Sequence, residues 1–161
     1  GLTEAAVVSA CMQGGQFSVI AISQRIKAWY QECICGYGLE GRLASIRALD
    51  EPLQNIGRVQ QNQSESLVRL AIDAVEQDGA DCLIMAGAPL AGLARSVSSQ
   101  IPVPVLDGVT CALIQAQAQV NLAANVPRMG SYASPPEKGH QGMSLALSAL
   151  IGRQKNITGS I

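Results

Sequence analysis

Charged residues are scarce in this 161-residue sequence, and that scarcity already excludes several kinds of protein. Only 14% of the residues are charged while 48% are hydrophobic, against about 25% charged in an average soluble domain. The net charge is −1, with acidic and basic residues interspersed, so we expect no nucleic-acid binding and no polybasic membrane surface. A chain this apolar is expected to cover part of its surface, either as a homo-oligomer or against a neighbouring domain.

Several sequence signatures are missing as well. No apolar run reaches the roughly 18 to 20 residues of a membrane span, and no basic, apolar leader is present. Five scattered cysteines, an odd number, predict no disulfide framework and favour a cytoplasmic location. Without a phosphate-binding loop or a G-x-S-x-G motif, neither nucleotide binding nor serine hydrolysis is expected. Cys33 and Cys35 alone are too few ligands for a zinc site, so no metal is predicted.

Strand and helix patterns alternate along most of the chain. This alternation, with short links, predicts an α/β fold in which a four-stranded parallel sheet carries helices on both faces. Residues 50–63 are polar and are predicted to form a loop over a pocket. The expected helices are residues 3–13, 24–35, 64–77, 90–97, 109–124 and 143–151, and the expected strands are residues 17–23, 43–49, 82–85 and 103–106.

Polar residues next to these segments predict several helix ends. Thr3 and Asp107 are suited to cap the first helix and the helix at 109–124, respectively. The helix at 24–35 is expected to bury an apolar face that includes Trp29 and Tyr30.

The sequence is organised around residues 79–108, where an apolar strand meets a corner of small residues and then a helix. Gly87 can adopt any backbone conformation, and Pro89 suits a first helical position. A ligand at this corner, at the carboxyl end of a strand, faces free N–H groups and a helix dipole that favour an anion. We therefore predict that Gly87, Ala88 and Pro89 bind a substrate carboxylate, although small residues at such a corner are also explained by packing alone.

Other candidate site residues follow the remaining strands. Ser23, Gln24 and Arg25 come at the end of the first strand, where a hydroxyl and a guanidinium suit a carboxylate. Ser23 is equally suited to cap the helix that follows. Arg47, in the second strand, and Tyr132, in a Gly-Ser-Tyr run, are further candidates for the pocket.

The run GADCLIMAGAPLAGLA, followed by IPVPVLDGV, resembles the second active-site segment of the aspartate/glutamate/hydantoin racemase superfamily. The resemblance extends to GLTEAA at the start, to FSVI at residues 17–20 and to GSY at residues 130–132. It implies one half of a two-domain racemase-like fold. Residues 1–126 then correspond to the second racemase domain, and residues 127–161 to a loop and C-terminal helix that pack on a missing N-terminal domain.

The resemblance also implies an activity. It indicates a cofactor-independent racemase or epimerase that acts at the carbon alpha to a carboxyl or carbonyl group of an amino-acid-like or hydantoin-like small molecule. Racemases of this family use two thiols, and Gly87 stands at the position of the second, so Gly87 and Ala88 are the implied catalytic positions. A one-cysteine decarboxylase or isomerase of the same superfamily, or a non-catalytic carboxylate-binding module, are the alternatives.

Overall fold

A computed structural model describes residues 1–50, 55–122, 129–131, 133 and 141–151 of the chain. The chain divides into two compact units, Gly1–Ala123 and Ala124–Ile161. In the second unit the structure describes one helix, α6 (Leu145–Ile151). Within the ranges given above, no helix combines the length and the apolar character that crossing a membrane requires.

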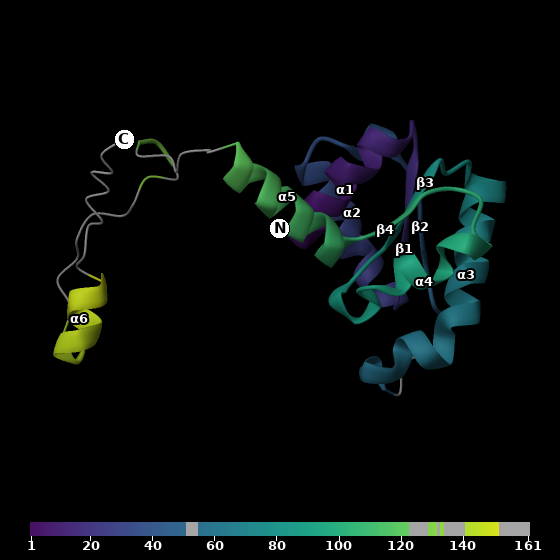
Figure 1. Ribbon diagram of the computed structural model, residues 1–161. Helices are drawn as coiled ribbons and strands as arrows, with labels where there is room; N and C mark the ends of the chain where they lie inside the picture. Colours follow the sequence, from purple (N-terminus) through teal and green to yellow (C-terminus); the bar gives the residue numbers. More distant parts are fainter. Residues whose placement is uncertain (51–54, 123–128, 132, 134–140, 152–161) are drawn as a thin grey trace. The chain divides into compact units, whose positions relative to one another are not determined.

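The first unit is built on a parallel sheet of four strands (Figure 1). The spatial order is β2-β1-β3-β4, and all three neighbouring pairs are parallel. The predicted sheet is therefore confirmed. Its strands are β1 (Phe17–Ala21), β2 (Leu43–Ala48), β3 (Cys82–Met85) and β4 (Val105–Asp107).

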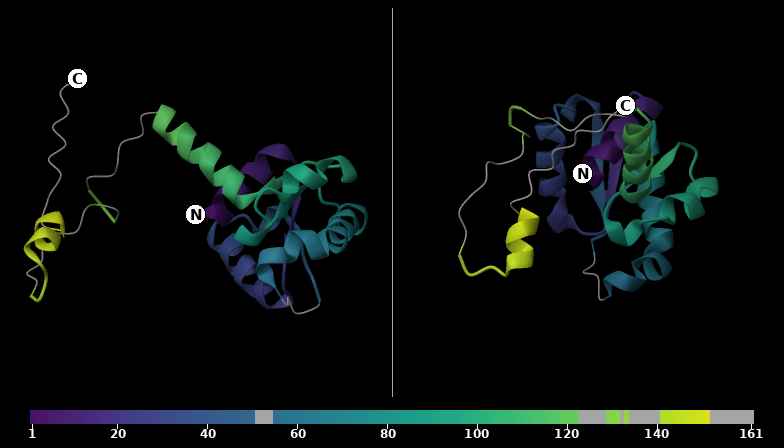
Figure 2. Two further views of the ribbon diagram at one scale, coloured as in Figure 1. Left: turned by 60° about the horizontal axis from the view of Figure 1, so that its bottom comes forward. Right: turned by 60° about the vertical axis from the view of Figure 1, so that its left-hand side comes forward.

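Helices cover both faces of the sheet, as predicted. One face packs on α1 (Leu2–Gln13) and α2 (Lys27–Gly36), and the other on α3 (Val59–Asp78) and α4 (Leu93–Val97). The last helix of this unit, α5 (Gly108–Asn121), packs against α1 and is drawn next to it in Figure 2. A side-chain amide joins these two helices, since Gln115 donates to the carbonyl of Ala5 and to the hydroxyl of Ser9, both at 2.9 Å.

The two cores follow from the alternation of side chains along each strand. Val19 and Ile84 point to the face covered by α1 and α2, whereas Ile20 and Leu83 point to the face covered by α3 and α4. All four side chains are buried, because the central strands of a parallel sheet are apolar on both faces.

Several details of the predicted elements are wrong. The helix expected at 90–97 begins only at Leu93, after a separate 3-10 turn, Ala88–Leu90. Thr3 lies inside α1, whose N-cap is Gly1, so it caps nothing. The segment expected to be a loop up to residue 63 instead contains a short 3-10 helix, Ile56–Arg58, and the first residues of α3 from Val59 onward. Trp29 lies 49% exposed rather than in the buried face of α2.

Candidate functional site

A cavity of about 510 Å³ lies at the carboxyl edge of the sheet, where β1 and β3 end. The chain leaves these two neighbouring strands toward opposite sides, since β1 is followed by β2 and β3 by β4. Such a switch point is the usual ligand position in an open α/β sheet. Most of the wall is apolar and comes from α1, α2 and the strand ends; the corner and the start of α5 contribute Ala86, Gly87, Ala88, Pro89, Gly108 and Val109.

The corner after β3 holds two exposed backbone donors at this cavity. Gly87 has φ 105° and ψ 144°, a conformation that residues with a side chain rarely adopt. The corner is fixed on both sides, because Ala86 donates to the carbonyl of Ile20 at 2.9 Å and Leu90 donates to that of Gly87 at 3.0 Å. Within the described part of the chain, the N–H groups of Gly87 and Ala88 have no hydrogen-bond partner.

The start of α5 forms the neighbouring wall. The carboxylate of Asp107 accepts hydrogen bonds of 2.8 Å from the N–H and the hydroxyl of Thr110, so the predicted cap is confirmed. Gly108 packs tightly on the first turn of α1, since a Cβ at this position would stand 3.0 Å from the carbonyl oxygen of Leu2. The positive ends of α1 and α5 therefore lie side by side at the cavity, which favours a bound anion.

Gln60, a residue that the sequence did not single out, holds the corner from the other side. Its amide nitrogen donates to the carbonyls of Pro89 at 2.8 Å and Ala91 at 2.9 Å. Gln60 lies in the first turn of α3, in the segment predicted as a loop. No motif marks it, because this contact joins residues about 30 positions apart.

Tyr30 was likewise expected only in an apolar face. Its ring is 4% exposed and packs edge-on against Trp29, with 5.0 Å between ring centroids. Its hydroxyl stands 3.7 Å from where a Cβ on Gly87 would be. Burial, and to a smaller extent Cys33, raise the pKa of Tyr30 above its ordinary value. The phenol therefore stays protonated at neutral pH and is a hydrogen-bond donor.

The cluster predicted after β1 lies at the same edge of the sheet but does not line this cavity. Ser23 accepts a 3.3 Å hydrogen bond from the N–H of Arg25, which matches the capping interpretation. Gln24 donates to the carbonyl of Ala48 at 3.0 Å and to the carboxylate of Asp50 at 2.7 Å. These contacts hold the ends of β1 and β2 together.

Arg47 is engaged elsewhere. Its guanidinium binds both carboxylate oxygens of Asp78, at 2.6 and 2.9 Å, and lies 3.6 Å from Asp73. The hydrogen bond from Arg47, reinforced by one of 2.6 Å from Ser45, lowers the pKa of Asp78 below its ordinary value. The structure thus gives Arg47 a role in fastening α3 to β2, away from the corner. Tyr132 lies outside the described residues.

None of the five cysteines, all of which are free thiols, lines the cavity. Cys82 is buried in β3, where desolvation raises its pKa to about 12. Burial also raises the pKa of Cys111. Neither forms a thiolate at neutral pH. Among the described residues, no group of three or more His, Cys, Asp or Glu side chains lies close enough to hold a metal ion.

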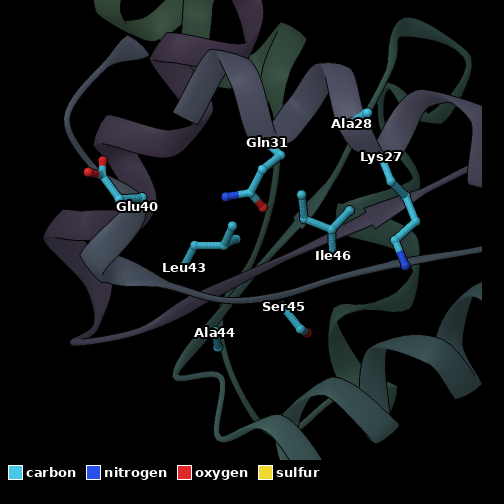
Figure 3. A pocket seen from close by; sticks show the side chains of 8 residues that line it. All are labelled: Lys27, Ala28, Gln31, Glu40, Leu43, Ala44, Ser45 and Ile46. Atoms are coloured by element: carbon cyan, nitrogen blue, oxygen red, sulfur yellow. The ribbon is translucent and has the colours of Figure 1, made fainter. Parts of the chain in front are cut away.

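A second recess lies between α2 and the edge strand β2 (Figure 3). Lys27 and Gln31 reach down from the helix, and Leu43 and Ile46 face them from the strand, while Ser45 points to the opposite side. Ser45 bonds Asp78 and the buried Ser18 there. This recess is lined mainly by side chains from the surface of α2 and from β2. The cavity at Gly87 is the better candidate site, because two backbone N–H groups without a partner among the described residues lie there.

Comparison with known proteins associates this arrangement with one family. The sequence model of the family described as Asp/Glu/Hydantoin racemase matches residues 1–116. A hydantoin racemase of Paenarthrobacter aurescens is 30% identical over 138 residues, which cover 86% of this chain and 58% of that protein. A hydantoin racemase of Pseudomonas sp. strain NS671 is 29% identical over 88% of this chain and 57% of its own length.

Solved structures give the same picture. An allantoin racemase from Klebsiella pneumoniae has a TM-score of 0.81 at 26% identity, and one from Pseudomonas fluorescens has 0.76 at 29% identity. Each match covers 88% of this chain, but only 58% and 60% of those chains, respectively. The chain therefore spans somewhat more than half the length of the proteins that it resembles.

Proposed function

Because the chain belongs to the Asp/Glu/hydantoin racemase family, we propose that it forms the substrate-holding half of a cofactor-independent racemase. The reaction inverts the carbon alpha to a carboxyl or carbonyl group of a hydantoin-like or amino-acid-like molecule. The observation that carries this proposal is that Gly87 and Ala88, whose N–H groups have no partner among the described residues, line an apolar cavity beside two helix N-termini.

Removing the proton from the α-carbon moves negative charge onto the neighbouring oxygen. Fixed donors aimed at that oxygen stabilise the charge without having to reorganise. The N–H groups of Gly87 and Ala88 supply such donors, and the apolar wall keeps water away and strengthens the interaction. Since Leu2, Ile26 and Val109 are part of that wall, the proposed substrate carries an apolar substituent.

The groups that move the proton come, in this proposal, from the portion of the relatives that the chain does not span. Gly87 has no exchangeable proton on a side chain, and the thiols of Cys82 and Cys111 stay protonated at neutral pH. The family's first thiol is then provided by a further domain, which also covers the cavity. The free state of all five cysteines supports a reducing, cytoplasmic location. Fractionation of the source cells, with an antibody to the chain, tests that location.

The activity is tested by proton exchange in D₂O, followed by NMR on a panel of 5-alkyl hydantoins, allantoin and amino acids. The protein with its preceding domain and this chain alone are assayed side by side. We expect exchange at the α-carbon only with the longer protein. If neither protein exchanges the proton, but ligands shift the NMR signals of both proteins, the chain is a non-catalytic binding module and not part of a racemase.

Two substitutions of Ala88 test whether the N–H group of this residue, rather than the backbone conformation of the corner, contributes to catalysis. Ala88→Pro removes one N–H group at the first residue of the 3-10 helix Ala88–Leu90, where proline is tolerated, and Ala88→Ser keeps that N–H. If the donor stabilises the developing charge, the proline variant loses about 100-fold or more in exchange rate while the serine variant stays close to the unmodified protein. Equal losses in both variants would contradict this role.

A further inference from the structure

Tyr30 combines three features that packing does not explain. The ring is almost fully buried, with 4% exposed, yet the polar end of the side chain reaches the corner of the cavity, 3.7 Å from the Cβ position of residue 87. Within the described part of the chain, no group forms a hydrogen bond with the hydroxyl. Among those residues, no fully buried side-chain oxygen or nitrogen lacks a partner, so the hydroxyl is open to the cavity rather than sealed in the core.

A tyrosine hydroxyl that opens into a cavity is available to form a hydrogen bond with a molecule bound there. Phenylalanine would fill the same core position but would present no hydrogen-bond donor to the cavity. The glycine at position 87 leaves the space in front of the hydroxyl free, because the nearest atoms to a Cβ there are Pro89 Cδ at 3.6 Å and Tyr30 Oη at 3.7 Å. The side of the cavity next to the free N–H groups thus offers one side-chain donor.

We propose that the Tyr30 hydroxyl donates a hydrogen bond to the substrate oxygen on which negative charge develops, together with the N–H groups of Gly87 and Ala88. This inference rests on the proposed function and names a side-chain member of its oxyanion site. The phenol keeps its proton throughout, because its buried position disfavours the phenolate. The hydrogen bond strengthens as the oxygen becomes charged, so it stabilises the transition state more than the bound substrate.

The test compares Tyr30→Phe with Ser98→Ala, which deletes a hydroxyl bonded to the carbonyl of Arg95 outside the cavity. Both are made in the protein that carries its preceding domain. Proton exchange of a 5-alkyl hydantoin in D₂O is measured together with the affinity for two probes. The barbiturate anion is a planar cyclic enolate, and a neutral 5-alkyl hydantoin has a similar ring without the charge. Thermal unfolding reports on the fold.

We expect Tyr30→Phe to lower kcat and the affinity for barbiturate by about tenfold or more, with KM and the affinity for the neutral hydantoin changed less than about threefold. Ser98→Ala should match the unmodified protein. Because the hydroxyl has no partner among the described residues, the melting temperature of Tyr30→Phe should not fall.

Other outcomes overturn the inference in recognisable ways. If Tyr30→Phe exchanges protons and binds barbiturate like the unmodified protein, the hydroxyl has no role while the proposed function stands. Equal weakening of both probes, or a lower melting temperature, makes Tyr30 a packing or general binding residue. If the unmodified protein exchanges no substrate, the proposed function fails, and the barbiturate affinities alone decide on Tyr30: unchanged or undetectable binding in the two proteins refutes the inference.

Discussion

At the scale of the residue, Gly87 decides what the corner is able to do. Its φ of 105° is available to glycine at little cost and to other residues only with strain. A Cβ at this position would lie 3.6 Å from Pro89 Cδ and 3.7 Å from Tyr30 Oη, which are ordinary contact distances. Glycine is therefore favoured by the backbone conformation and not by a lack of space. A residue with a Cβ, cysteine included, occupies this position either with strain or after the corner has changed its backbone conformation.

Gly87→Ala is therefore expected to lower the free energy of unfolding by about 1 to 3 kcal/mol. Gly41→Ala is the matched control, because a Cβ at Gly41 meets no atom within 4 Å and its φ is not positive. Urea unfolding of the two variants measures the difference. Equal stability would mean that the corner relaxes without strain.

At the scale of the element, the first turn of α3 positions the corner through Gln60. Gln60→Ala removes two hydrogen bonds to backbone carbonyls, of 2.8 and 2.9 Å, and should cost about 1 to 2 kcal/mol of stability. It should also weaken binding of barbiturate in titration calorimetry, because the donors at Gly87 and Ala88 lose their fixed direction. The neighbouring, exposed Gln61 provides the control as Gln61→Ala. If Gln60→Ala is less stable but binds barbiturate with unchanged affinity, Gln60 stabilises the fold without positioning the donors.

The far end of α3 gives a prediction about pH. The pKa of Asp78 is lowered in the folded protein, so its ion pair with Arg47 stabilises the fold above the unfolded pKa of about 3.9. This stabilisation is lost as the pH falls through the lower, folded value. Since both side chains are less than a quarter exposed, Asp78→Asn should cost about 1 to 2 kcal/mol at pH 7. In urea titrations, the difference in stability between the two proteins should shrink as the pH falls below the unfolded pKa and through the lower, folded one. A difference that is independent of pH would contradict the ion pair.

The sequence predicted what depends on local chemistry. The strands, the cap at Asp107 and the glycine corner each follow from residues next to one another, and the structure confirms them. It did not predict Gln60 or the hydroxyl of Tyr30, because both act across contacts that exist only after the chain has folded. The ion pair of Arg47 with Asp78 was not predicted for the same reason, since only the structure brings the two side chains together.

For the molecule as a whole, the low fraction of charged residues is reflected in exposed apolar side chains on α5. Leu113, Ile114 and Val120 are 72%, 62% and 73% exposed. Apolar side chains that gather on one exposed helix favour association. The chain spans 58% of its hydantoin racemase relative from Paenarthrobacter aurescens, so in a longer protein this helix has further chain available to cover it.

We expect this chain alone to sediment as species larger than a monomer, because a second copy covers the exposed helix. The double variant Leu113→Gln, Val120→Gln should shift the distribution toward monomer in sedimentation velocity. Ile56→Gln alters an isoleucine that is 56% exposed on a different element and should leave the distribution unchanged. A monomer in all three cases would show that the apolar side chains of α5 tolerate water.

The order of the strands has a consequence for how the molecule assembles in time. Phe17 in β1 pairs with Cys82 in β3 at the centre of the sheet. These strands are far apart in the sequence, because α2, β2 and α3 lie between them, so their pairing has to close a long loop. Contacts between segments far apart in the sequence form slowly. The cavity lies where β1 and β3 end, so it exists only after these two strands have paired. A ligand of the cavity therefore has nothing to bind early in folding, and its effect should fall on the rate of unfolding, which it slows, while the rate of folding stays the same.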